Sequence, residues 1–200
     1  MQRVATFLCS ILFLLTLTAA AQEGGRMQVS LLGTGFFTKD STAGLVRQQV
    51  SESGGFRVGF RYNLTRWISA DVDYGRNRIT DRDFTPSLSR VQSDAHQVMG
   101  GFVVNLPFFP KFKPYLLAEG GAILFDPTGG RFSDVARAQR QAEGTFAYGG
   151  GVDYPIFKYI ALRAEYRGLV YSAPDFNIPA LNVNAVTHTA QPSAGVVIRF

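Results

Sequence analysis

Four carboxylates in the middle of the chain are the first candidates for chemistry. Asp71 and Asp73 are two residues apart, and Glu119 and Glu165 follow later in the chain. Such carboxylates can act as general acid and base when one of them holds a proton. Here they alternate with arginines, and a neighbouring guanidinium keeps a carboxylate ionised. We therefore predict that they form ion pairs and do not catalyse a reaction.

The two histidines, His96 and His188, are the other residues that could react or bind a metal. A lipid-modifying enzyme in a membrane would need a histidine close to a serine and a carboxylate, and neither histidine begins a His-x-Ser sequence. A zinc site would need more histidines or a cluster of carboxylates. We therefore predict no catalytic residue, no metal site and no cofactor, and interpret both histidines as interfacial polar side chains.

The N-terminal segment has the pattern of an export signal. Arg3 precedes an apolar stretch from Phe7 to Leu17, and Ala19 to Ala21 supply small residues for cleavage. The stretch is shorter than the roughly 20 residues that a membrane-spanning helix needs. We predict a signal peptide over residues 1–21 and one domain over residues 22–200, rather than an uncleaved anchor. The single cysteine, Cys9, would leave with the signal, so the mature domain would have no thiol.

The mature domain is dominated by segments in which apolar and polar residues alternate. In residues 55–64, Phe56, Val58 and Phe60 share one face, while Arg57 and Arg61 share the other. This period of two is typical of β-strands with one apolar face. The segments with this pattern are residues 27–37, 55–64, 67–75, 95–106, 114–125, 144–154, 160–171 and 189–200.

The length of these segments and of their connections indicates a transmembrane barrel. Each segment has about 9–12 residues, as a tilted strand needs to cross a bilayer, whereas soluble strands are nearer five or six. No later segment is apolar enough for a membrane-spanning helix, so a membrane protein of this sequence must be a closed barrel. The connections alternate between short turns and long loops at 38–53, 76–94, 126–143 and 172–187. This asymmetry is typical of barrels with short periplasmic turns and long external loops.

Aromatic residues cluster beside the expected short turns. A ring of such side chains suits the headgroup zone of a membrane. The alternative is the core of a soluble barrel, which would instead have charges outside. The residues concerned are Tyr62, Trp67, Phe108, Phe109, Phe112, Tyr154, Phe157, Tyr159 and Phe200.

The polar faces of the strands carry charges of both signs. In an eight-stranded barrel the interior is just wide enough to be filled by side chains. We predict that these charges pair inside the barrel and close it; a narrow ion path is the alternative. The predicted lumen charge network is Arg57, Arg61, Asp71, Asp73, Glu119, Asp153, Arg163, Glu165 and Arg167. Pro192 falls within the last strand, where we expect a bulge or the strand's outer end.

Several motifs resemble the small OmpA-like outer-membrane β-barrel domain family. They are Tyr62–Trp67 with Asp71–Tyr74, Lys113–Ala118, Gly149–Tyr154 and Arg163–Arg167, in that order along the chain. The C-terminal strand, with Val196, Ile198 and Phe200, is similar to the signal that the barrel assembly machinery reads. The resemblance implies an all-β, eight-stranded, antiparallel up-and-down barrel in the outer membrane, without a periplasmic peptidoglycan-binding domain.

The function expected from these patterns is structural or one of surface interaction, without enzymatic activity. A small low-conductance channel and, less readily, a lipid-modifying enzyme are the alternatives.

Expected partners are outer-membrane lipid, lipopolysaccharide, periplasmic chaperones and the assembly machinery, with the protein a monomer. Arg131, Arg137 and Arg140, in an expected external loop, could bind lipopolysaccharide phosphates, although solvated loop charge is as good an interpretation. The net charge is +5, but the basic residues form no Lys/Arg run of the kind that binds nucleic acid. Nucleic acid is therefore not an expected partner.

Overall fold

The computed structural model describes residues 26–38, 41–43, 46–50, 53–85, 89–109, 111–129, 140–172 and 186–200. The predicted signal peptide, residues 1–21, lies outside these ranges and stays a prediction. In the described part of the chain, no helix is long and apolar enough to cross a membrane.

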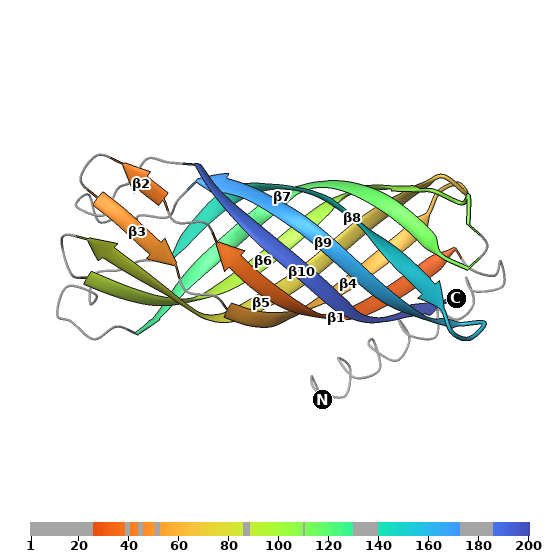
Figure 1. Cartoon of the computed structure of the whole chain (residues 1–200), viewed down its shortest axis with the longest axis horizontal. Helices are drawn as coiled ribbons and strands as arrows, with labels where there is room; N and C mark the ends of the chain where they lie inside the picture. Colours follow the sequence, from red (N-terminus) through yellow and green to blue (C-terminus); the bar gives the residue numbers. More distant parts are fainter. Residues whose placement is uncertain are drawn as a thin grey trace, which may run out of the picture.

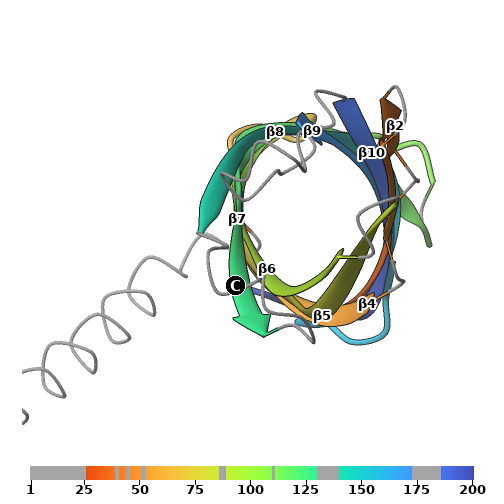
Figure 2. The same cartoon turned by 90° about the vertical axis from the view of Figure 1, so that its left-hand side faces the viewer.

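Eight long antiparallel strands form a closed barrel (Figures 1 and 2). Neighbours along the chain pair with one another, and β1 pairs with both β4 and β10, so the first and last strands close the wall. The additional pairing of β5 with β6 completes the ring. The barrel strands are β1 (Met27–Thr38), β4 (Ser53–Asn63), β5 (Ile68–Thr85), β6 (Ser89–Asn105), β7 (Lys113–Gly129), β8 (Gln141–Pro155), β9 (Ile160–Ser172) and β10 (Val186–Arg199).

The apolar face of the strands lies outside the barrel and the polar face inside, opposite to a soluble protein. In β1, the even-numbered residues from Gln28 to Phe36 are buried, while Val29 and Leu31 are exposed. Exposed apolar side chains continue around the wall, where lipid would cover them. Among them are Phe56, Val58, Val72, Val98, Phe102, Leu116, Phe146, Leu162, Val196 and Ile198.

The short connections and the C-terminus lie at one end of the barrel (Figure 1). In the turn before β5, the Thr65 side chain accepts hydrogen bonds from the backbone N–H groups of Trp67 and Ile68, at 3.1 and 3.0 Å. The aromatic side chains predicted to ring this end include Trp67, Phe108 and Phe157, which are exposed. The opposite end carries the longer connections.

The prediction of a long loop over residues 76–94 was wrong. β5 continues to Thr85 and β6 starts at Ser89, so that a paired hairpin extends past the rest of the barrel (Figure 1). Two short strands, β2 (Ser41–Ala43) and β3 (Val46–Val50), lie within the predicted loop 38–53, and β3 pairs with the outer part of β5. Alternating hydrophobicity marks only the lipid-covered part of a strand, whereas backbone pairing continues beyond it.

The expected bulge at Pro192 is also absent. β10 begins at Val186, and its register with β9 runs unbroken through the pair Pro192–Tyr166. On the other side, the register with β1 is the same before and after Pro192, but Gly35 and Phe36 have no paired partner in β10. Proline has no N–H to donate, so the ladder to β1 is interrupted without bending the strand.

Candidate functional site: the charged interior of the barrel

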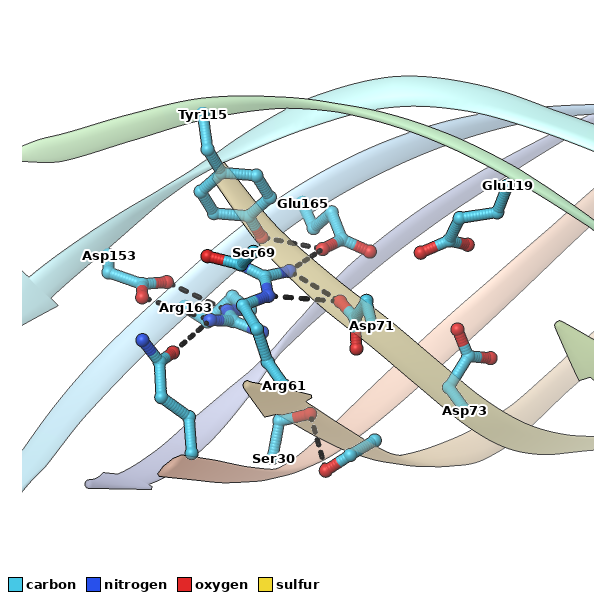
Figure 3. A network of polar contacts seen from close by, with 12 residues as sticks. Ser30, Arg61, Ser69, Asp71, Asp73, Tyr115, Glu119, Asp153, Arg163 and Glu165 are labelled. Carbon is cyan, nitrogen blue, oxygen red and sulfur yellow. Dashed lines mark hydrogen bonds and ion pairs between the residues drawn. The ribbon is translucent and has the colours of Figure 1, made fainter. Parts of the chain in front are cut away.

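Glu165 is at the centre of a network of charges inside the barrel (Figure 3). Its carboxylate accepts hydrogen bonds from Arg57, from Arg167 at 2.7 Å and from the Tyr115 hydroxyl at 2.5 Å. Arg61 is 3.8 Å from the same carboxylate and donates to Asp71 at 2.7 Å. These side chains come from four different strands, β4, β5, β7 and β9, so the contacts cross the interior of the barrel.

Arg167 holds three carboxylates at once. Besides Glu165, it contacts Asp73 at 2.7 Å and Glu119 at 2.7 Å. The exposed fraction of the Arg167 and Glu119 side chains is 2% and 0%, so water does not reach them. Buried charges are tolerated when they are paired in this way.

A second cluster lies closer to the end with the short turns. Arg163 donates two hydrogen bonds to Asp153, at 2.7 and 3.0 Å, and a further one to Gln28. Arg199 contacts the same aspartate at 2.8 Å. Two guanidinium groups also make cation–π contacts with the Tyr115 ring. Those of Arg61 and Arg163 lie 4.3 and 5.1 Å from the centre of this ring.

The nine residues predicted to form the network all lie on the inner face and all take part in ion pairs. The prediction left out Arg199 and Tyr115. With Arg199, five arginines face five carboxylates, so the formal charges cancel. Both omitted residues belong to the inward-facing set of their strands, so the alternation itself was the signal that could have found them.

Glycines on the inner face make room for the long side chains. Gly149 pairs with Arg167 across β8 and β9, and Gly195 pairs with Arg163 across β10 and β9. A Cβ atom at Gly149 would lie 2.0 Å from the Tyr166 carbonyl oxygen. The strands approach so closely that only glycine fits at this position.

The other half of the interior contains both polar and apolar buried side chains, and the sequence interpretation missed the apolar ones. Phe36, Ile123 and Phe125 are completely buried on the inner face. The Phe125 and Tyr171 rings are 5.7 Å apart. The Tyr171 and Thr189 hydroxyls are 2.9 Å apart, so a polar contact also joins this layer to β10. Because Val29 and Leu31 face outward, the same alternation places Phe37 outward and Phe36 inward, so this signal could also have found Phe36.

The two histidines lie on the outer face, each beside a tyrosine hydroxyl. The Tyr74 hydroxyl is 2.7 Å from His96 Nδ1, and the Tyr148 hydroxyl is 2.7 Å from His188 Nε2. In the described part of the chain, no group of three or more His, Cys, Asp or Glu residues could hold a metal ion. The network carboxylates are bound by arginines and are almost completely buried.

The remaining predicted residues lie near the two ends. Val196, Ile198 and Phe200 face outward and are exposed, and the assembly role of these residues stays a prediction. Arg140 is exposed and contacts Asp126 at 2.8 Å. Arg131 and Arg137 lie outside the described residues.

Residues 6–200 match the profile of the outer membrane protein beta-barrel domain. The chain belongs to this family. Solved structures with the same fold include Neisserial surface protein A (NspA), with 20% identity and a TM-score of 0.60, over 88% of this chain and 99% of that one. OprG from Pseudomonas aeruginosa has 14% identity and a TM-score of 0.53, over 88% and 96% of the two chains. AlkL has 17% identity and a TM-score of 0.54, over 88% and 90%.

Membership of the outer-membrane barrel family explains why the apolar side chains of the wall lie outside and the polar ones inside. The predicted resemblance to small eight-stranded outer-membrane barrels is confirmed, and so is the fold class. Identities of this size establish the fold alone. No curated protein is significantly similar to the chain in sequence.

Proposed function

We propose that this outer-membrane barrel is a non-enzymatic scaffold with a closed interior, whose activity resides on its external surface. The observation that carries the proposal is the burial of the charged side chains that cross the interior. Arg57, Arg167 and Glu119 each have an exposed fraction of 1%. A conducting path would need water beside at least some of these charges.

A second layer supports a closed interior. Beyond the charges, Gln97 and Gln191 exchange two hydrogen bonds across the barrel, at 3.3 and 3.1 Å. Phe36 and Phe125 fill the space towards the end with the long connections. An ion would have to displace both the paired charges and the glutamine and phenylalanine side chains beyond them.

Planar-bilayer recording tests the closed interior. The purified, refolded protein is expected to give no steady unitary conductance at concentrations where an open porin, as a positive control, conducts. Steady and reproducible openings of the wild-type protein would contradict the proposal and favour a small channel.

External loops are the proposed site of interaction, because the β5–β6 hairpin extends beyond the barrel at that end (Figure 1). Arg140 is proposed to contact lipopolysaccharide phosphates, since 70% of its side chain is exposed and only its Nε donates to Asp126. Arg140→Gln should lower the lipopolysaccharide retained on the purified protein, and Lys111→Gln, at the opposite end, should not. Equal retention in both variants would remove Arg140 from the proposal.

Export through residues 1–21, recognition of the last strand by the assembly machinery and a monomeric state belong to the same proposal. A heat-shift gel on outer-membrane fractions tests them together with the fold. The unboiled mature protein should migrate as a compact monomer in that fraction, and a soluble periplasmic protein without a shift would contradict it.

A further inference from the structure

A cavity lies at the end of the barrel with the short turns, next to the charged network. Its volume is about 790 Å³, which is within the usual range for small-molecule sites. The ends of β1, β4, β6, β7, β8 and β10 and the short turns form its wall, and Tyr115 and Asp153 of the network are among its lining residues. In transmembrane barrels the end with short turns faces the periplasm.

The charged residues lining this cavity are almost all basic. They are Arg26, Arg66, Lys113, Lys158 and Arg199, with Asp153 as the single acidic residue. Asp153 is already bound by Arg163 and Arg199. The wall of the cavity therefore supplies no further carboxylate for Arg66, Lys113 and Lys158.

Several of these cations have no carboxylate partner among the described residues. Arg66 lies 4.9 Å from the centre of the Trp67 ring, and Lys158 lies 5.1 Å from that of Tyr159, each as a cation–π contact. Lys113 forms no ion pair within the described part of the chain. Arg199 does bind Asp153, but its Nε is buried and has no hydrogen-bond partner among the described residues.

We propose that this cavity, defined by its five basic lining residues, binds a phosphate group. Guanidinium groups bind phosphate oxygens through paired hydrogen bonds, and lysine supplies a compact charge. A phosphate carries more charge than a single carboxylate and so offsets more of the excess. Basic residues gathered in a recess with low-dielectric walls also concentrate anions there.

The height of the cavity in the membrane indicates where such a phosphate would come from. Trp67, Phe109 and Tyr159 are exposed aromatic residues at the same end, and such residues mark the headgroup zone. The source is either the headgroup of an anionic phospholipid of the periplasmic leaflet or a soluble phosphorylated molecule. The chemistry of recognition is the same for both.

Titration with pyrophosphate tests the site. The full mature protein is placed in phosphatidylcholine nanodiscs, and binding is measured by calorimetry and by the emission of Trp67, the only tryptophan of the chain. Saturable binding is expected, with a change in emission because Arg66 lies over the Trp67 ring. Citrate, a multivalent carboxylate, should bind more weakly; no saturable binding, or equal binding of citrate, would overturn the proposal.

Matched variants test whether pyrophosphate binds in the cavity. Lys113→Gln combined with Lys158→Gln should weaken pyrophosphate binding by about tenfold or more, as expected for losing charge-assisted contacts. Lys111→Gln combined with Arg78→Gln removes the same charge, but neither residue lines the cavity. An equal loss in this control pair would show general attraction only and would overturn the proposal. A heat-shift gel confirms that each variant is folded.

The lipid composition then distinguishes the two sources. If nanodiscs with cardiolipin suppress pyrophosphate binding in the wild type but not in the Lys113→Gln/Lys158→Gln variant, the site takes a headgroup. If binding is equal in both lipids, it takes a soluble phosphate. Both results support a phosphate site, and neither depends on whether the interior conducts.

Discussion

Replacing Glu165 by glutamine removes one charge from the centre of the network and keeps the shape of the side chain. Arg167 would retain Asp73 and Glu119, each at 2.7 Å. Arg57 would have no carboxylate partner left among the described residues, because Glu165 is its only ion-pair partner there. The main cost is therefore one uncompensated buried cation, which corresponds to about 3–5 kcal/mol.

Urea unfolding in phospholipid vesicles, followed by Trp67 fluorescence, measures this cost. Glu165→Gln should lower the free energy of unfolding by about 3–5 kcal/mol. Adding Arg57→Met removes the unpaired cation and should recover most of the loss, since the remaining formal charges again cancel. Glu143→Gln is the control, because Glu143 is half-buried and, among the described residues, its side chain accepts one hydrogen bond, from Gln141, which a glutamine can also accept.

The reasoning is refuted if Glu165→Gln costs less than about 1 kcal/mol, the usual size for an exposed ion pair. The charges would then be hydrated in solution rather than held in a dry network. Failure of Arg57→Met to restore stability would show that the loss comes from packing. A loss in Glu143→Gln as large as in Glu165→Gln would point to a general effect of reduced negative charge.

Three further changes test the packing of the interior. Gly149→Val should prevent folding, because its Cβ would lie 2.0 Å from a carbonyl oxygen of β9. Gly144→Val in the same strand should still fold, because a Cβ there meets nothing within 4 Å. Loss of the heat-shifted band in both variants would contradict this reasoning. Tyr115→Phe removes the 2.5 Å hydrogen bond to Glu165 and should cost about 1–3 kcal/mol in urea unfolding, without a change in conductance. Phe36→Ala deletes a completely buried ring and should cost about 3–5 kcal/mol; a cost below about 1 kcal/mol would mean that this layer is loosely packed.

The interior charges could be predicted from sequence because strand alternation is strict. Arg57 and Arg61 share a face with each other and not with Phe56, whatever the partner strand is. Which charges pair could not be predicted, because that depends on the register and tilt of strands far apart in the chain. Arg57 and Glu165 are 108 residues apart and meet only when the barrel is closed.

The limits of the strands were predicted less well, for a physical reason. Alternation of apolar and polar residues ends where the lipid ends, but the β5–β6 ladder continues to the pair Phe84–Ser89. The buried apolar side chains around Phe125 were missed because the inner face was expected to be polar, whereas a dry interior accepts the same apolar residue types as lipid.

The sequence by itself determined the class of molecule and the face of each strand. Period-two alternation, strand length and the order of short and long connections require a closed barrel, since a membrane offers no partners for free backbone groups. Only the tertiary structure decided that Arg199 completes a neutral network and that Phe36 and Phe125 are buried in the far half of the interior. It also gathered Lys113, Lys158 and Arg199 around one cavity, because closure of the barrel sets which distant strand ends become neighbours.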